Sequence, residues 1–187
     1  MIAGVDEAGR GALAGPVVAA AVILGPNTNL SLLKDSKTLT PIQRQQAFNN
    51  IQETSIVTVG IISHRLIDKL NILNATLLAM TFAIKKLPKN CLNVKIDGNK
   101  VPSSLSEYEL EAIIKGDSKV PAISAASIIA KVTRDTIMDR CHTKFPEYEF
   151  QQHKGYGTES HYNCLFKNGI SPIHRKSFNL TKQESLF

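Results

Sequence analysis

Short apolar runs separated by polar or glycine-rich segments predict β-strands in the first third of the chain. These runs are rich in valine, isoleucine and alanine, and they span residues 1–5, 16–24 and 55–62. The polar segment 41–53 lies between the second and third runs and predicts a helix. Thr40 is a suitable N-cap for this helix, and Pro41 occupies the first helical position, where a proline is tolerated.

The middle of the chain predicts a buried helix followed by a strand. Residues 71–87 are apolar nearly all round and rich in alanine, leucine and methionine, which favours a helix covered on most sides. Residues 93–96 predict a fourth strand, which ends at Asp97. A strand, a helix and a strand in this order are typical of a crossover between parallel neighbours, with helices on the faces of the sheet. The predicted class is therefore α/β.

A further apolar run and a long helix follow. The run is EAIIKGD, residues 111–117, and it ends in Gly116 and Asp117. Residues 124–145 predict a long helix with Ser124 as its N-cap. Its apolar positions lie mostly on one side: Ile128, Ile129, Val132 and Ile137. The rest of the chain is rich in loops and basic residues.

Three of the apolar runs end in carboxylates, namely Asp6 with Glu7, Asp97, and Asp117. The carboxyl ends of strands in an α/β sheet can converge at one edge, where ligands usually bind. Carboxylates gathered there repel one another unless divalent cations lie between them, and Mg²⁺ prefers such oxygen ligands. Two such ions about 3.5 to 4 Å apart can stabilise the attacking and leaving oxygens of a phosphodiester. Considered singly, each acid also fits a helix cap, a turn or a pair with lysine.

Length and charge narrow the class of function. A chain of 187 residues fits a single domain, residues 1–187, that can bury a core without disulfides. Its net charge of +6 indicates an anionic partner, for which a nucleic acid is the commonest candidate. A basic surface that serves solubility alone would explain the same charge.

The cysteines and the N-terminus predict a cytoplasmic protein. Cys91, Cys141 and Cys164 are odd in number and lack the spacing of a zinc site or a disulfide framework, so we expect reduced thiols. The chain starts directly with strand-like sequence, without the features of a secretory signal. No apolar run approaches the roughly 20 residues needed to cross a bilayer. We expect no membrane association, and a monomer.

Seven motifs are spread in order over nearly the whole chain. They are GVDEAGRGALAGPVVAAAV, DSKTLT, NILNATLLAM, IDGN, KGDSKVPAISAASIIAKVTRD, HKGYGT and SPIHRKSF. Together these motifs resemble bacterial ribonuclease HII, of the type 2 ribonuclease H family. The resemblance implies a ribonuclease H-like mixed sheet of about five strands flanked by helices. It also implies a small helical C-terminal part, at about residues 141–187.

The same resemblance implies an activity and its cofactors. The expected enzyme is an endoribonuclease that cleaves the RNA strand of RNA:DNA hybrids and acts at single ribonucleotides embedded in duplex DNA. It leaves 3′-hydroxyl and 5′-phosphate ends. By motif match, the catalytic residues and metal ligands are Asp6, Glu7, Asp97 and Asp117, which would hold two Mg²⁺ or Mn²⁺ ions when substrate is bound.

Residues that read the ribonucleotide are also implied by the resemblance. Gly9, Arg10 and Gly11 match the loop that grips the ribonucleotide from its minor-groove side. Tyr156 matches a tyrosine that packs on the following sugar and helps to read the 2′-hydroxyl, the group that separates RNA from DNA. We expect Tyr156, between two glycines, to be exposed. Without the family, the alternatives are a glycine-rich turn between two strands for Gly9, Arg10 and Gly11, and a loop residue that rests on the core for Tyr156.

Other polar side chains are candidates for phosphate contact in a basic groove, with solvated surface charge as the alternative. They are Ser36, Lys37, Lys154, Arg175 and Lys176. Asp135 lies four residues after Lys131, the spacing of a helical ion pair, and we place it in a supporting role. The resemblance argues against general-base roles for His153, His161 and His174, since metals can activate the attacking water, and we expect His174 to be structural.

The last five residues, QESLF, resemble the Gln-x-x-Leu-Phe peptide by which bacterial replication and repair proteins bind the sliding clamp. Gln183, Leu186 and Phe187 would make the contacts, and a tail folded back on its own domain is the alternative. Two other functions stay open. A non-catalytic hybrid-binding module would bind without metal-dependent cleavage, and another nuclease or recombinase on the same fold would cut all-DNA duplex.

Overall fold

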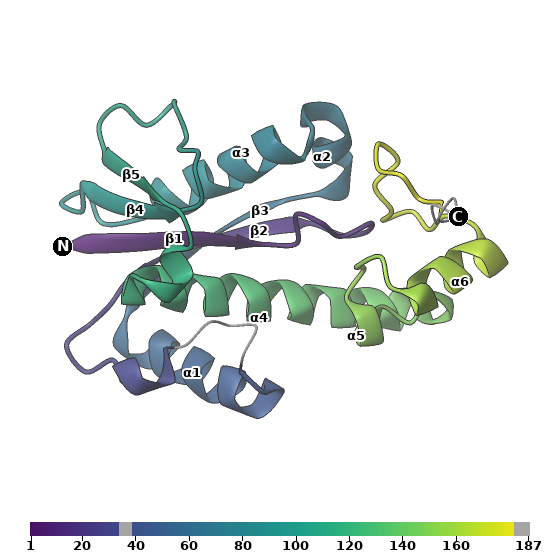
Figure 1. Cartoon of the computed structure of the whole chain (residues 1–187), viewed down its shortest axis with the longest axis horizontal. Coiled ribbons are helices and arrows are strands. Elements are labelled where there is room, and N and C mark those ends of the chain that lie inside the picture. Colours follow the sequence, from purple (N-terminus) through teal and green to yellow (C-terminus); the bar gives the residue numbers. More distant parts are fainter. Residues whose placement is uncertain (34–38, 182–187) are drawn as a thin grey trace.

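The computed structural model describes residues 1–33 and 39–181, which form a mixed five-stranded sheet between helices (Figure 1). The strands are β1 (Ile2–Ala8), β2 (Val17–Ile23), β3 (Ile56–Ile62), β4 (Asn93–Asp97) and β5 (Glu109–Ile113). Their order in the sheet is β3-β2-β1-β4-β5. The pairs β1/β2 and β2/β3 are antiparallel, whereas β1/β4 and β4/β5 are parallel. The expected mixed sheet is confirmed.

The predicted crossover does not join neighbouring strands. It leaves β3 and returns through α2 (His64–Leu70) and α3 (Ile72–Ile84) to β4. The strands β1, β2 and β3 form an antiparallel meander, and β4 lies on its far side, beside β1 and separated from β3 by β1 and β2. The parallel pairing of β4 is therefore with β1, and the expectation of parallel neighbours across the crossover is wrong for β3 and β4.

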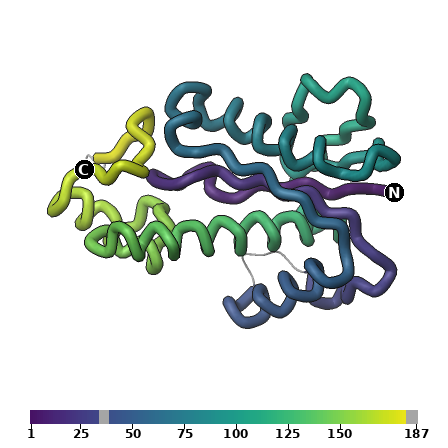
Figure 2. The backbone as a smooth tube through the Cα atoms, turned by 180° about the vertical axis from the view of Figure 1, so that it is seen from behind, coloured from purple at the N-terminus to yellow at the C-terminus, as the bar shows by residue number. Residues whose placement is uncertain are grey.

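Helices cover both faces of the central strands, as Figures 1 and 2 show. Alternate residues of β2 divide between two apolar cores. Ala19 and Ala21 pack with α3, whereas Ala20 and Val22 pack with α4 (Pro121–Lys144). Every residue of β2 is consequently buried, which explains its continuous apolar sequence.

Close contact between α4 and β1 is possible because β1 carries a glycine there. A Cβ atom on Gly4 would lie 2.1 Å from the carbonyl carbon of Ala122 and 2.2 Å from the backbone nitrogen of Ile123. No side chain fits in that space without moving the helix. This approach sets the height of α4 over the end of β1.

The first helix, α1 (Pro41–Thr54), begins as the sequence predicts. The Thr40 side chain accepts a hydrogen bond from the Gln43 backbone N–H, and the Gln43 side chain accepts one from the Thr40 backbone N–H. The predicted buried helix is α3, although Phe82 is 43% exposed on its outer side.

Ser124 is not the N-cap of the long helix, and that prediction is wrong. The helix α4 begins at Pro121, after Val120, and Ser124 is buried one turn inside it. Proline suits the first helical position because its φ angle is preset and its missing N–H has no partner there. The start of α4 is thus fixed by Pro121 and by the preceding 3₁₀ turn, Gly116–Ser118.

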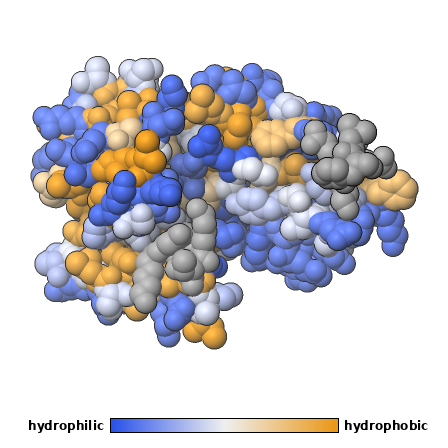
Figure 3. Space-filling model, viewed as in Figure 1, coloured by the Kyte–Doolittle hydropathy of each residue, from blue (hydrophilic) through white to orange (hydrophobic). Residues whose placement is uncertain are grey.

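The C-terminal part packs against the second half of α4, and it contains a 3₁₀ turn (Pro146–Tyr148) and two helices, α5 (Phe150–His153) and α6 (Glu159–Asn168). The loop after β1 contacts two segments of this part. The Leu13 N–H donates to Gly155 O, and the Arg175 N–H donates to Leu13 O. Hydrophilic residues predominate over this part in Figure 3, whereas apolar surface gathers near β4 and β5.

Three histidines form a buried stack in this C-terminal part. His174 Nδ1 accepts from the Ser171 N–H, so His174 Nε2 carries the proton and donates to His161 Nε2, 2.9 Å away. His161 Nδ1 in turn donates to the Tyr156 carbonyl. Burial lowers the pKa of both His161 and His174 to about 4, and the ring of His153 stacks on that of His161. These contacts agree with structural roles.

Within the described residues, no helix is both long and apolar enough to cross a membrane. The three cysteines are all described and free, in agreement with the expectation of reduced thiols.

The histidine stack predicts a pH dependence of stability. Burial lowers the pKa of His161 and His174 from 6.5 to about 4, so between these values the unfolded chain binds protons that the folded chain excludes. Their contribution to stability is therefore complete above about pH 6.5 and is lost as the pH falls toward about 4. We expect His174→Gln to make the free energy of unfolding less dependent on pH across this range, measured by urea unfolding.

The matched control is His142→Gln, a half-buried histidine of α4 outside the stack. Carboxyl groups with raised pKa values change stability in the opposite direction, but they do so equally in wild type and variant, so the difference in slope isolates the stack. An unchanged slope in His174→Gln would contradict the assignment.

Candidate active site

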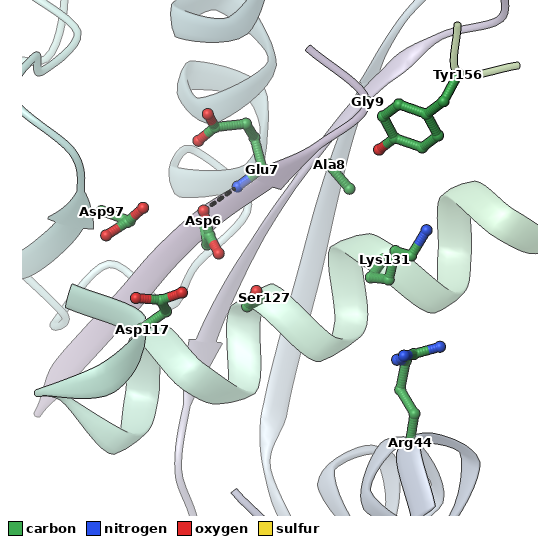
Figure 4. A pocket seen from close by; sticks show the side chains of 10 residues that line it. All are labelled: Asp6, Glu7, Ala8, Gly9, Arg44, Asp97, Asp117, Ser127, Lys131 and Tyr156. Carbon is green, nitrogen blue, oxygen red and sulfur yellow. Dashed lines mark hydrogen bonds between the residues drawn. The ribbon is translucent and has the colours of Figure 1, made fainter. Parts of the chain in front are cut away.

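The ends of β1 and β4 and the turn after β5 bring the four predicted acids into one cleft (Figure 4). Asp6 and Glu7 lie at the end of β1, Asp97 is the last residue of β4, and Asp117 lies in the 3₁₀ turn before α4. The cleft has a volume of about 380 Å³. Its other lining residues are Ala8, Gly9, Arg44, Ser127, Lys131 and Tyr156.

Strand register explains why Asp6 and Asp97 lie side by side. Val5 of β1 pairs with Ile96 of β4 in parallel, so Asp6 and Asp97 follow at the same level of two neighbouring strands. Asp6 shares the face of the sheet that packs against α4, and Glu7 alternates to the opposite face. The carboxylates thus approach the mouth of the cleft from both sides of β1.

Backbone donors orient two of the carboxylates. Asp6 Oδ1 accepts from the Glu7 N–H at 2.7 Å, and Asp97 Oδ1 accepts from the Gly116 N–H at 2.6 Å. The second bond ties the end of β4 to the turn that carries Asp117. These bonds leave further carboxylate oxygen lone pairs available to a ligand.

Burial and mutual repulsion disfavour the charged forms of the first two acids. The pKa of Asp6 is raised well above its usual value, first by burial and then by the negative charges of Glu7 and Asp97, against a hydrogen bond from Ser127. Burial also raises the pKa of Glu7, although Arg10, 3.1 Å away, opposes this shift. A cation in the cleft would stabilise both carboxylates in their charged forms.

The donor set fits a hard divalent cation. Within residues 1–33 and 39–181, no three His, Cys, Asp or Glu side chains are already close enough together to hold a metal ion. The four acids nevertheless supply only oxygen donors, and Asp6, Asp97 and Asp117 have no basic partner in that same part of the chain. Oxygen ligands of this kind suit Mg²⁺ and Mn²⁺.

The predicted glycine and arginine loop follows β1 directly. Gly9 is buried with φ at +96°, whereas Arg10 and Gly11 are exposed. The Arg10 guanidinium pairs with the Glu7 carboxylate at the cleft mouth. A side chain on Gly11 would meet no atom within 4 Å, so its surroundings are open to solvent.

Tyr156 lines the same cleft, but it is only half-exposed, so the expectation of an exposed aromatic is wrong. Two cations account for its partial burial. The Lys131 Nζ atom lies 5.3 Å from the ring centroid, and the Arg134 Cζ atom lies 4.9 Å from it. Both cations are attracted to the face of the ring, which holds the phenol over the cleft.

Three polar residues of the cleft were not among the sequence candidates: Arg44, Ser127 and Lys131. A signal existed for two of them, because Ser127 and Lys131 are four residues apart and so share one face of the predicted helix. Asp135 does not line this cleft but pairs with Lys131 at 2.9 Å, which agrees with the predicted helical pair. The pair holds the Lys131 ammonium in place beside the cleft.

The candidates for phosphate contact separate into different environments. The prediction for Arg175 is wrong, because its side chain is fully buried and donates to backbone carbonyls. Lys154 pairs with Asp139, and Lys176 is exposed. The remaining predicted residues lie outside the described part of the chain: Ser36, Lys37, Gln183, Leu186 and Phe187.

Comparison with known proteins identifies the family. The family description "Ribonuclease HII" matches residues 3–181. Ribonuclease HII of Pelagibacter ubique is 50% identical, with 96% of each chain covered. Ribonuclease HII of Coxiella burnetii is 48% identical, with 100% of this chain and 92% of the relative covered.

Solved structures agree with this fold. One is ribonuclease HII in a complex with PCNA from Archaeoglobus fulgidus, with a TM-score of 0.80, 27% identity and coverage of 100% of this chain and 98% of that chain. Another is ribonuclease H2 from Pyrococcus horikoshii, with a TM-score of 0.78, 29% identity and coverage of 96% and 94%. This chain belongs to the ribonuclease HII family, the endoribonucleases that cleave RNA in RNA:DNA hybrids.

Proposed function

We propose that this chain cuts the RNA strand of hybrids, and the strand beside a single ribonucleotide embedded in duplex DNA, by hydrolysis that leaves 3′-hydroxyl and 5′-phosphate ends. The observation that carries this proposal is the shared cleft of four carboxylates, the Gly9 backbone and Tyr156. A cleft that joins metal-type ligands to a sugar-sized aromatic contact supports cleavage that depends on the sugar.

Divalent cations would be held by Asp6, Glu7, Asp97 and Asp117. A related fold, a ribonuclease HIII, has been solved in complex with Mn²⁺. Two bound ions of this type stabilise the attacking and leaving oxygens of a phosphodiester. The same oxygen ligands accept Mg²⁺ or Mn²⁺, so this set of acids favours neither.

The protein side chains would place the nucleotide for the reaction. Lys131 lies in the cleft with its ammonium held by Asp135, where it would contact a backbone phosphate. Tyr156 would pack on the sugar, and Arg10 would supply donors once it leaves Glu7. Positioning of this kind contributes to the rate by fixing the reacting groups in line.

The first test is cleavage of a DNA duplex that carries one ribonucleotide, with Mg²⁺, Mn²⁺ or EDTA. We expect metal-dependent nicking by the wild type and at least about a hundredfold loss in Asp97→Asn, because one charged ligand is removed while size is kept. Asp139→Asn is the matched control, since this exposed acid pairs with Lys154 outside the cleft.

Other results would point elsewhere. A wild type that binds the duplex but never cuts it would favour the binding module. Cleavage of the matched all-DNA duplex would favour a nuclease of another kind.

Tyr156 is tested by two substitutions. Tyr156→Ala removes the ring that lies over the cleft and should lower kcat/KM on the single-ribonucleotide duplex by about tenfold or more. Tyr156→Phe keeps the ring and its contacts with Lys131 and Arg134, so its loss should be smaller. Equal activity of all three proteins would mean that the tyrosine is an ordinary loop residue.

A second function, clamp binding, is supported by the solved complex of a related ribonuclease HII with PCNA. We propose that Gln183, Leu186 and Phe187 of this chain bind a bacterial sliding clamp. Deleting residues 183–187 should weaken the affinity for a purified clamp by about tenfold or more, since two apolar side chains leave its surface, and should preserve cleavage. Unchanged clamp affinity in the truncated protein, measured by surface plasmon resonance, would exclude this role.

A further inference from the structure

Two fully buried arginines, Arg134 on α4 and Arg175 in the C-terminal segment, lie behind the loop that follows β1. Neither forms an ion pair with a carboxylate in the part of the chain that the structure describes. A buried charge without a counterion is costly unless its hydrogen bonds are made. Their donors must therefore be satisfied by neutral acceptors.

Arg175 donates to the turn that carries the predicted ribonucleotide contacts. Its Nη2 atom lies 2.7 Å from Gly9 O, and its Nη1 atom lies 2.9 Å from Arg10 O. Its Nε atom donates to Gly15 O at 3.0 Å, and Nη2 also reaches Pro16 O at 3.1 Å. One guanidinium thus connects both ends of the loop.

Arg134 connects the same loop to the segment of Tyr156. Its Nε atom donates to Pro16 O at 3.0 Å, and Nη2 donates to Ala14 O at 3.1 Å. Its Nη1 atom donates to Lys154 O at 2.9 Å, two residues before Tyr156, and its Cζ atom lies 4.9 Å from that ring. Pro16 O is therefore an acceptor shared by the two arginines.

Gly9 shows how tightly the turn is packed on these side chains. A Cβ atom at Gly9 would lie 2.0 Å from Arg134 Nε and 2.8 Å from Pro16 O. The glycine is required here by the guanidinium behind it, in addition to its φ of +96°. Gly9 and Arg134 are therefore packed too closely for any side chain to lie between them.

We propose that Arg134 and Arg175 are positioning residues that fix the distance between the Gly9–Gly11 turn and Tyr156, and thereby set the discrimination between ribose and deoxyribose. This inference rests on the proposed function of that turn and tyrosine. A planar guanidinium with five N–H donors can bridge several carbonyls at once, whereas a lysine ammonium bonds as a single point. Lysine keeps the charge but cannot hold the spacing.

The test compares Arg175→Lys and Arg134→Lys with Arg140→Lys, an exposed arginine of α4. Affinity is measured by fluorescence anisotropy in Ca²⁺ for a duplex with one ribonucleotide and for the matched all-DNA duplex. We expect both buried-site variants to lose about tenfold in the ratio of the two affinities, with affinity for all-DNA duplex unchanged, because the reading elements are displaced. The Arg140→Lys ratio should match wild type.

A second pair of variants keeps both arginines. Gly9→Ala should push the turn away from Arg134 and lose the same discrimination. Gly169→Ala is its control, since Gly169 also has positive φ, at +71°, but has no atom within 4 Å of a Cβ and lies at the end of α6. If circular dichroism shows that a lysine variant is unfolded, the comparison of Gly9→Ala with Gly169→Ala tests the inference in its place.

Three outcomes would overturn the inference. Equal losses on both duplexes would show that the arginines serve only the fold. Unchanged discrimination in folded variants, Gly9→Ala included, would show that the spacing does not depend on them. A wild type without preference for the ribonucleotide duplex would overturn the proposed function itself, and the inference with it.

Discussion

The close packing of α4 on β1 is the constraint on which the rest of the site depends. Gly4 lets the helix backbone approach the strand so closely that a methyl group would not fit between them. From this position α4 brings Ser127 to the Asp6 carboxylate and Lys131 to the cleft. The turn that leads into the helix carries Asp117, and Gly116 of that turn holds the Asp97 carboxylate. One contact between backbones thus sets the relative positions of the acids of β1, of β4 and of the 3₁₀ turn, and of the Lys131 ammonium beside them.

Charges of both signs are buried at this end of the sheet, and they are stabilised in different ways. Arg134 and Arg175 are surrounded by backbone carbonyls, which satisfy their donors without a counterion. The acids have fewer partners, and burial together with mutual repulsion raises the pKa of Asp6. The two buried arginines are therefore stabilised by hydrogen bonds within the protein and need no bound ligand. A bound cation would balance the charges of the acids, which is the electrostatic basis of the metal proposal.

Sequence reasoning was successful where local chemistry decides the structure. The N-cap at Thr40, the strand that ends at Asp97 and the Lys131–Asp135 pair are local features, and the structure contains all of them. It was wrong at Ser124, because a good capping residue was available inside a helix that Pro121 had already started. The basic charge of Arg175 likewise indicated solvent and phosphate, although its buried guanidinium donates to four backbone carbonyls within the protein. Residue type alone does not reveal which side of a loop an arginine occupies.

The sequence by itself determined the class of fold, the motifs of the family and the four acids at the ends of apolar runs. These follow from periodicity, from turn chemistry and from short ordered patterns, all of which are local along the chain. Only the tertiary structure decided that Asp6 and Asp97 lie level on neighbouring parallel strands, and that Lys131 and Arg134 both lie over the Tyr156 ring. Those arrangements join residues far apart in the chain, and strand order, helix height and burial fix them jointly.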